Sequence, residues 1–166
     1  FLDTGSLLPV QPTLVNFHRQ VPTYFLKDDH DTYVNDSWPG SRFQWTEDFT
    51  FEDGQRIFIQ QTGLPAPAYR TFQIGKQLQV WLMEGRDYRS PNNAPDGPEK
   101  SIWGEEQMAW LERTLTESTA KFRLIVSPTP LVGPDRDNKH DNYSNDVFAT
   151  EGQQVRKILA SYPNLV

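Results

Sequence analysis

Short apolar runs alternate along this chain with longer segments of helical periodicity. Runs rich in β-branched and aromatic residues predict strands, and apolar positions that recur every three or four residues predict helices. The predicted strands span residues 23–27, 69–74, 78–83 and 122–126, and the first two predicted helices span residues 51–61 and 101–118. A further helix is predicted from about Thr150, and Leu165 and Val166 should open another strand. The first twenty residues carry weak signals and are predicted as loop or partial strand.

Local signals mark several boundaries and buried faces. Gly63 should cap the 51–61 helix, which would turn Ile57 and Phe58 inward. Thr150 and Gln153 have the spacing of a capping box at the start of the last helix. The buried stripes of the last two helices are predicted to be Trp103, Gln107, Trp110, Leu111 and Leu115, and then Val155, Ile158, Leu159 and Tyr162.

Strands that alternate with helices predict an α/β layered domain with a partly parallel sheet. Gly75 and Lys76 fit a tight hairpin between two of the strands, and the continuous apolar run 80–83 fits a strand covered on both faces. The length of 166 residues, with no linker-like segment, predicts a single domain over residues 1–166.

Composition narrows the function classes. The net charge of −6 argues against a nucleic-acid-binding surface or an anionic membrane surface. The chain has no cysteine, which excludes disulfides, zinc–thiolate sites and cysteine nucleophiles. It contains no apolar run long enough to span a membrane, no export signal, no Gly-rich phosphate loop and no G-x-S-x-G segment. The start without methionine and the strand-like end lead us to expect that both ends lie inside a longer chain.

The segment Asp28, Asp29, His30 and Asp31 follows the apolar run 24–26 directly. Three carboxylates so close together repel one another unless a cation or a hydrogen-bond network offsets the repulsion. Carboxylates with an imidazole suit metals that prefer hard oxygen ligands, such as Ca, Mn or Fe. Asp28 and Asp29 point to opposite faces of an extended chain, so both can bind one ion only if the chain bends there. A solvated acidic turn, with His30 paired to Asp31, is the alternative.

Two further polar clusters follow predicted strands. Arg86 and Arg89 lie in residues 84–89, and residues 127–142 form a proline-fixed loop rich in amides and charges. If the strands are parallel, all three clusters meet at one sheet edge, where α/β proteins place their sites. The arginines would then bind an anionic substrate or neutralise carboxylates, and structural ion pairs are the alternative. The loop would line a substrate site with Asn138, His140, Asp141 or Asn142. The alternative is a rigid surface loop without a function in binding.

Four segments in this order resemble the alkaline phosphatase D (PhoD-like) metallophosphatases. The similarity runs from about residue 21 to the end, and its segments are Lys-Asp-Asp-His-Asp at 27–31, Trp-Leu-Met-Glu-Gly-Arg-Asp-Tyr-Arg-Ser-Pro-Asn at 81–92, Ile-Trp-Gly-Glu-Glu-Gln at 102–107 and Ser-Pro-Thr-Pro-Leu-Val-Gly-Pro-Asp-Arg at 127–136. The resemblance implies a calcineurin-like metallophosphoesterase fold, a sheet sandwich flanked by helices, present here in part as the central portion of a catalytic domain. It also implies hydrolysis of phosphate monoesters or diesters.

The resemblance carries over to individual residues. Asp29 takes a metal-ligand place, with Asp28 as the second candidate, and His30 takes the catalytic place. Arg86 and Arg89 match the family's Asp-x-Arg-x-x-Arg, although Glu84 stands where Asp is commoner, and both arginines are expected to bind substrate. Asn142 is the candidate substrate-binding residue of the proline-fixed loop. The expected cofactors are divalent or trivalent ions (Ca, Fe, Mn or Zn), and the expected location is extracellular or periplasmic.

The chain also departs from the family. An upstream Gly-Asp-x-x-Tyr motif and a downstream Gly-Asp-Arg-His segment are missing, so the metal centre is expected to need the remainder of a longer chain. Two other interpretations stay open. One is a non-catalytic module with a structural Ca site in the acidic loop. The other is a glycosidase, which would require Asp29 and Glu84 to face each other across about 5–10 Å.

Overall fold

The computed structural model describes residues 12–64, 66–133, 136 and 138–166. Its helices are α1 (Pro12–Gln20), α2 (Asp29–Thr32), α3 (Phe51–Thr62), α4 (Gly104–Glu117) and α5 (Ala149–Ala160), with short 3-10 turns η1 (Gln44–Thr46) and η2 (Asp146–Phe148). Its strands are β1 (Arg70–Ile74), β2 (Leu78–Leu82) and β3 (Phe122–Val126). The predicted α/β class is confirmed. No helix in these described ranges is long and apolar enough to cross a membrane.

The sheet is mixed and has the order β1-β2-β3. Strands β1 and β2 form the predicted antiparallel hairpin, with Arg70 opposite Leu82. Strands β2 and β3 are parallel, with Leu82 opposite Val126. On the far side of β3, Leu165 forms a parallel bridge with Arg123, so the strand predicted at Leu165 begins here as a single bridge. The carboxyl ends of β2 and β3 therefore lie together, as the sequence predicts for parallel strands.

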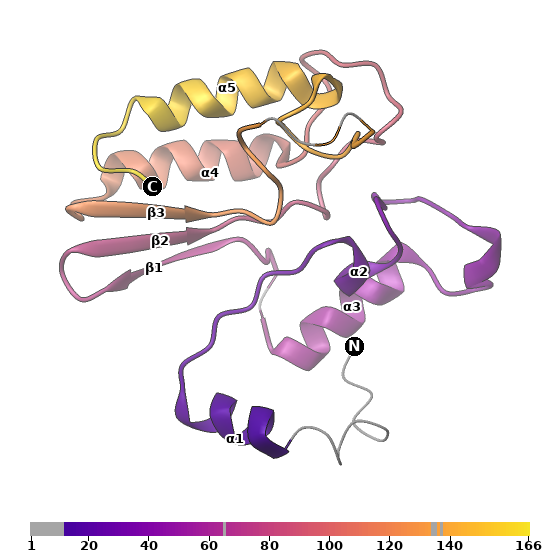
Figure 1. Ribbon diagram of the computed structural model, residues 1–166, viewed down its shortest axis with the longest axis horizontal. Helices are drawn as coiled ribbons and strands as arrows, with labels where there is room; N and C mark the ends of the chain where they lie inside the picture. The colour runs from indigo at the N-terminus through magenta and orange to yellow at the C-terminus, as the bar shows by residue number, and fades with distance from the viewer. Residues whose placement is uncertain (1–11, 65, 134–135, 137) are drawn as a thin grey trace.

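Helices α4 and α5 lie side by side over one face of the sheet, and α1, α2 and α3 lie on its other side (Figure 1). The main core fills the space between the sheet and the α4/α5 layer. Its fully or nearly buried members are Trp81, Met83, Ile102, Trp103, Met108, Leu111, Leu115, Tyr143, Phe148 and Val155. The predicted stripe of α4 is confirmed, although Trp110 is only partly buried, and the predicted inner face of α5 packs on this core.

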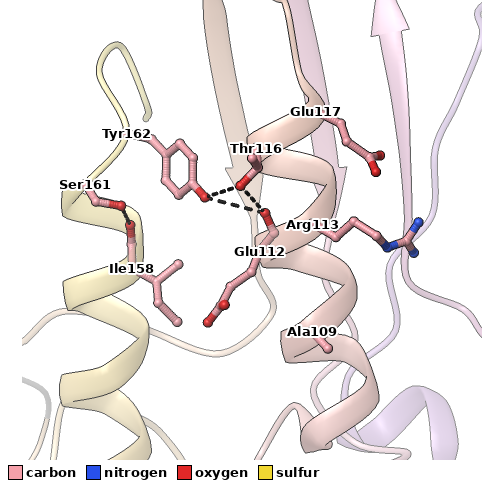
Figure 2. A pocket seen from close by; sticks show the side chains of 8 residues that line it. All are labelled: Ala109, Glu112, Arg113, Thr116, Glu117, Ile158, Ser161 and Tyr162. Atoms are coloured by element: carbon pink, nitrogen blue, oxygen red, sulfur yellow. Dashed lines mark hydrogen bonds between the residues drawn. The ribbon is translucent and has the colours of Figure 1, made fainter.

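The outer side of the helical layer is a shallow groove between α4 and α5 (Figure 2). The hydroxyl groups of Thr116 and Tyr162 lie 2.9 Å apart across it, and Tyr162 also donates to the carbonyl oxygen of Glu112 at 3.4 Å. These contacts join the ends of the two helices. They therefore hold the two helices beside each other in the helical layer.

Helix α3 begins and ends as its sequence predicts. Thr50 is the N-cap and shares a capping box with Asp53, which satisfies free N–H groups of the first turn. Gly63 ends the helix in the left-handed region with φ 65°, so its predicted cap role is confirmed. The predicted inward residues Ile57 and Phe58 are only half-buried.

The first turn of α5 is capped from a distance rather than locally. The helix begins at Ala149, and Phe148 at its N-cap makes no side-chain hydrogen bond there. Thr150 instead donates its hydroxyl group to Asp96 at 2.7 Å, and its backbone N–H donates to the same carboxylate at 3.1 Å. The predicted capping box of Thr150 and Gln153 is therefore wrong, because a carboxylate from a distant loop provides the acceptor.

Residues 23–27 do not form the predicted strand. They have no regular secondary structure and belong to no ladder among the described strands, and Tyr24 and Phe25 are exposed. The Tyr24 ring stacks on Phe72 of β1 at a centroid distance of 4.1 Å, and Arg70 donates to the carbonyl oxygen of Phe25 at 2.7 Å. The aromatic residues that suggested a strand pack by ring stacking instead of backbone pairing.

The prediction of loop or partial strand for the first twenty residues is wrong where it is tested. Residues 12–20 form the helix α1, and none of its residues is buried. A helix without a buried face has no clear apolar stripe in its sequence, so the helix was not predicted. The part of that prediction that covers residues 1–11 lies outside the described residues.

Gly54 of α3 lies directly against α2. A Cβ atom added to Gly54 would stand 1.4 Å from the carbonyl oxygen of Thr32, so the two helices touch through a backbone that tolerates no side chain. We expect Gly54→Ala to lower the free energy of unfolding by about 1–3 kcal/mol or more, because α2 must move away. Urea denaturation measures this loss. Gly97→Ala is the control, since nothing lies within 4 Å of its Cβ position, and equal losses in both variants would contradict the expectation.

Candidate functional site

The acidic segment begins as a single helical turn. Asp28 is the N-cap of α2, and its Oδ1 accepts the backbone N–H of Asp29 at 2.9 Å. Asp31 completes a capping box, because its Oδ2 accepts the backbone N–H of Asp28 at 2.9 Å. Two of the three carboxylates are therefore used to start a helix. The chain also bends here, which turns the side chain of Asp29 toward the interior, where it is 8% exposed.

Arg86 is the cation at which three chain segments meet. It follows β2, is 3% exposed, and donates from Nε to Oδ1 of Asp28 at 2.6 Å. Its Nη2 donates to Oδ2 of Asp141 at 3.2 Å and lies 3.6 Å from Oδ2 of Asp29. Burial alone would lower the pKa of Arg86, but the charges of Asp28 and Asp29 outweigh it, so the pKa lies above its ordinary value. Arg86 therefore stays charged in the interior.

Three carboxylates gather beside this guanidinium. Asp29, Asp36 and Asp141 each offer an oxygen, and these oxygens all lie within 4.8 Å of one another. Asp36 reaches this position from a left-handed turn with φ 56°, where its backbone N–H donates to Oδ2 of Asp29 at 2.7 Å. The ammonium group of Lys139 lies 3.1 Å from Asp36 and 3.5 Å from Asp141. Cations of the chain itself thus offset part of the negative charge.

A cavity of about 220 Å³ opens at this cluster. It is lined by Asp28, Asp29, Asn35, Arg86, Pro128, Thr129, Pro130, Lys139, Asp141 and Asn142. Thr129 is 3% exposed, and its hydroxyl group has no hydrogen-bond partner among the described residues. The Nη1 atom of Arg86 is likewise buried without such a partner. Buried polar atoms without partners are rare and cost free energy, so they favour a site that takes a polar ligand.

The charge balance keeps Asp141 ionised. Burial alone would raise the pKa of Asp141, but the positive charges of Lys139, Arg86 and Arg89 oppose it, and the pKa lies below its ordinary value. A carboxylate that is buried and still charged attracts cations.

The donor set fits a hard cation. Asp29, Asp36 and Asp141 supply carboxylate oxygens of the type that Ca²⁺ and Mn²⁺ prefer. Oδ1 of Asp141 is buried and makes no hydrogen bond with the described residues, although the ammonium group of Lys139 lies 3.5 Å away. This acceptor is the observation that favours a bound ion. Lys139 lies close to the same oxygens, so an ion bound there would share them with its ammonium group or replace it.

The residues predicted from sequence separate into two groups. Asp28, Asp29, Arg86 and Asn142 all line the cavity. His30 is exposed and is not among the lining residues; its backbone N–H donates to Oδ1 of Asp29 at 2.8 Å. Asp28 bonds to Arg86 and caps α2, and it is not a member of the group of three carboxylates.

Arg89 lies behind the cavity rather than on its wall. It is 3% exposed and donates to the carbonyl oxygen of Asp141 at 2.8 Å and to Oδ1 of Asn92 at 2.9 Å. Burial, reinforced by the charge of Arg86, lowers the pKa of Arg89 to about 10. These contacts hold the backbone that carries Asp141, which is a supporting arrangement.

Several site residues escaped the sequence reasoning. Asp36 lies outside the three polar clusters predicted from sequence, and Thr129 lies in the proline-fixed loop but was not predicted as a site residue. Lys139 and Lys27 were not predicted as site residues either. The Asp in a turn-rich stretch eight residues after Asp28 was the signal available for Asp36, because aspartate tolerates the left-handed region. Glu84 is 2% exposed and binds internal donors, which argues against a pair of catalytic acids made by Glu84 and Asp29.

Comparison with known proteins agrees with this architecture. The model of the PhoD-like phosphatase family matches residues 8–161. A solved structure of PhoD is similar in fold, with a TM-score of 0.61 at 19% sequence identity over 83% of this chain. The chain spans 32% of the length of that PhoD chain, and no curated protein matches it. By the family match, this chain belongs to the PhoD-like phosphatases.

Proposed function

We propose that this chain forms part of a metal-dependent hydrolase of phosphate esters and that the cavity at Arg86 is its substrate site. The observation that carries the proposal is the buried guanidinium of Arg86 at the meeting point of Asp28, Asp29 and Asp141. A fixed, water-poor positive charge beside carboxylates suits an anionic ester together with a cation. Membership of the PhoD-like phosphatases supports the same reaction class.

The carboxylates of Asp29, Asp36 and Asp141 would hold the cation. When bound, such an ion supplies positive charge that activates water and polarises the phosphoryl group. Ca, Fe, Mn and Zn all remain candidates, and so do monoester and diester substrates. Because the carboxylates already interact with Arg86 and Lys139, the ion must compete with two internal cations for them.

The remaining roles belong to residues of the chain itself. Arg86 would bind phosphoryl oxygens through Nη1, which has no hydrogen-bond partner in the described part of the chain, and would stabilise the charge that builds up on them. Asn142, which lines the cavity, would orient the ester. His30, whose backbone N–H donates to Asp29, would protonate the departing oxygen. Arg89 would hold Asp141 in place through its backbone carbonyl group.

We also propose the cellular setting and the extent of the unit. The family points to an extracellular or periplasmic enzyme, and the chain is taken as one domain over residues 1–166. Because it spans about a third of the PhoD chain, the full activity is expected to require the longer enzyme.

Asp29→Asn tests the proposal. We expect turnover of 4-nitrophenyl phosphate and bis(4-nitrophenyl) phosphate, with Ca²⁺, Mn²⁺ or Fe²⁺ added, to fall by at least about 100-fold, because a charged metal ligand is lost. Asp48→Asn is the control, since Asp48 is exposed and lies outside the cavity.

Calorimetric titration with the same ions completes the test. The hydrolase is supported if the longer enzyme binds metal and turns over substrate, and if both properties are lost in Asp29→Asn but kept in Asp48→Asn. Ca²⁺ binding without turnover supports the structural-calcium module instead. Turnover that survives Asp29→Asn or does not respond to chelation would refute the metal-dependent mechanism.

A further inference from the structure

Lys27 is a buried lysine outside the cavity. It is 3% exposed, and its ammonium group donates to Oε1 of Glu84 at 2.8 Å, to Oδ1 of Asp87 and to Oγ1 of Thr32 at 3.3 Å. All three N–H groups of the ammonium therefore have an acceptor. Two of these acceptors lie in the segment that follows β2, and the third lies in α2. Lys27 thus joins the acidic segment to the segment that carries Arg86.

Glu84 links Lys27 to the backbone of Arg86. Its Oε1, which binds Lys27, also accepts the backbone N–H of Arg86 at 2.9 Å, and its Oε2 accepts the backbone N–H of Asp87 at 2.7 Å. The side chain of Gln107 on α4 holds the backbone N–H and carbonyl group of Glu84, both at 2.9 Å. The turn at residues 84–87 is therefore fixed from two sides, by α4 and by Lys27.

We infer that Lys27 is a positioning residue for the substrate site: it acts through Glu84 to fix the backbone of Arg86, and through the turn of α2 to fix Asp28 opposite the Arg86 guanidinium. The functional meaning of this role rests on the proposed phosphate site, but the geometry does not. Thr32 donates its hydroxyl group to the carbonyl oxygen of Asp28 at 3.0 Å, so the contact of Lys27 with Thr32 extends to the residue that binds Nε of Arg86.

The charge pattern explains why the position needs a lysine. Glu84 and Asp87 would otherwise place two carboxylates in the interior without a counter-charge, because Arg86 gives its side chain to Asp28 and Asp141. An unpaired buried carboxylate binds a proton or draws in water, and in either case the hydrogen bonds that hold the turn change. Loss of Lys27 should therefore move Arg86 even though the two side chains share no contact.

The test follows the Nε–H proton of Arg86 by NMR, since this proton is bound to Asp28 and the Arg86 side chain is 3% exposed. We expect Lys27→Gln to speed its exchange with solvent by about tenfold or more, because the turn opens more often. The matched control is Lys100→Gln. Lys100 is equally buried, but its ammonium group binds the carbonyl oxygens of Asn92 and Ala94, so exchange at Arg86 should stay at the wild-type rate.

Equal exchange in Lys27→Gln and wild type would overturn the inference, and so would equal acceleration by both lysine variants, which indicates general loosening. If Lys27→Gln does not fold, Lys27→Arg keeps the charge but cannot place its donors on all three acceptors. It should then speed the exchange by about threefold, and an unchanged rate in that variant would overturn the inference as well.

Kinetics in the longer enzyme separate this inference from the proposed function. If Lys27 acts through Arg86, the double variant Lys27→Gln, Arg86→Gln should be no slower than Arg86→Gln alone. If the rate losses of the two single variants multiply in the double variant, the two residues act independently and the positioning role is overturned. Absence of wild-type turnover would count against the proposed function only, because the exchange rates still decide whether Lys27 fixes Arg86.

Discussion

Replacing Arg86 by glutamine is expected to lower kcat/KM for a phosphate ester by about 100-fold to 1,000-fold. Effects of this size follow when a preorganised donor to the transition state is removed from a site that excludes water. Arg86 is 3% exposed, and its guanidinium is fixed by Asp28 and Asp141 before any substrate binds. Glutamine retains a hydrogen-bond donor but not the charge. We therefore expect kcat to fall and KM to rise, as measured by steady-state kinetics on 4-nitrophenyl phosphate.

Arg56→Gln is the matched control for this loss. Arg56 also pairs with an aspartate, Asp53, but its side chain is 59% exposed on α3. Exposed pairs contribute little, so this variant should keep wild-type kinetics and stability. The Arg86 expectation fails if both variants have similar kcat/KM values. It also fails if the activity of Arg86→Gln returns fully at a temperature where the variant is folded, since this would indicate a structural role alone.

The sheet and its helical layer could be predicted from sequence because their signals are local. Strands β2 and β3 each end in an unbroken apolar run, at residues 80–82 and 124–126, and the stripe of α4 has helical spacing. The order of strands and helices then limits the sheet to a few arrangements. The predictions failed where packing partners come from far along the chain. Asp96 caps α5 from a position 54 residues away, and the Tyr24 ring stacks on Phe72 of β1. The local sequence around Thr150 and Tyr24 therefore predicted a capping box and a strand that do not form.

In the candidate site too, residues with a local sequence signal were predicted, and a residue whose position depends on a distant contact was missed. Arg86, Asp29 and Asn142 were predicted, the first two because unusual charges directly follow apolar runs and a family motif covers them. Convergence of the segments at one place was predicted from parallel strands, and it occurs although the first segment follows no strand. Asp36 was missed because its contribution depends on a left-handed turn that returns it to Asp29. Charge spacing in the sequence cannot give that geometry.

Lys27→Met is expected to cost about 3–5 kcal/mol of unfolding free energy near neutral pH, because one partner of a buried ion cluster is removed. The side chains of Lys27 and Glu84 are 1% and 2% exposed, so little solvent screens the charge that remains. Urea denaturation monitored by tryptophan fluorescence measures the loss. Lys139→Met is the comparison, since Lys139 is more exposed and its partner Asp141 keeps its contact with Arg86, so its loss should be smaller.

The loss in Lys27→Met should also depend on pH, in a direction set by Glu84. Burial raises the pKa of Glu84, and Lys27 opposes this rise. Without Lys27 the folded-state pKa rises further above the unfolded value, so stability is retained at low pH and lost as pH increases through the folded-state pKa. The difference from wild type should therefore be larger at about pH 8 than at about pH 5. A Lys27→Met, Glu84→Gln double variant should regain part of this stability at the higher pH, because one of the two carboxylates that pair with Lys27 is gone while Asp87 remains. A difference that does not depend on pH would show that Glu84 does not carry the charge.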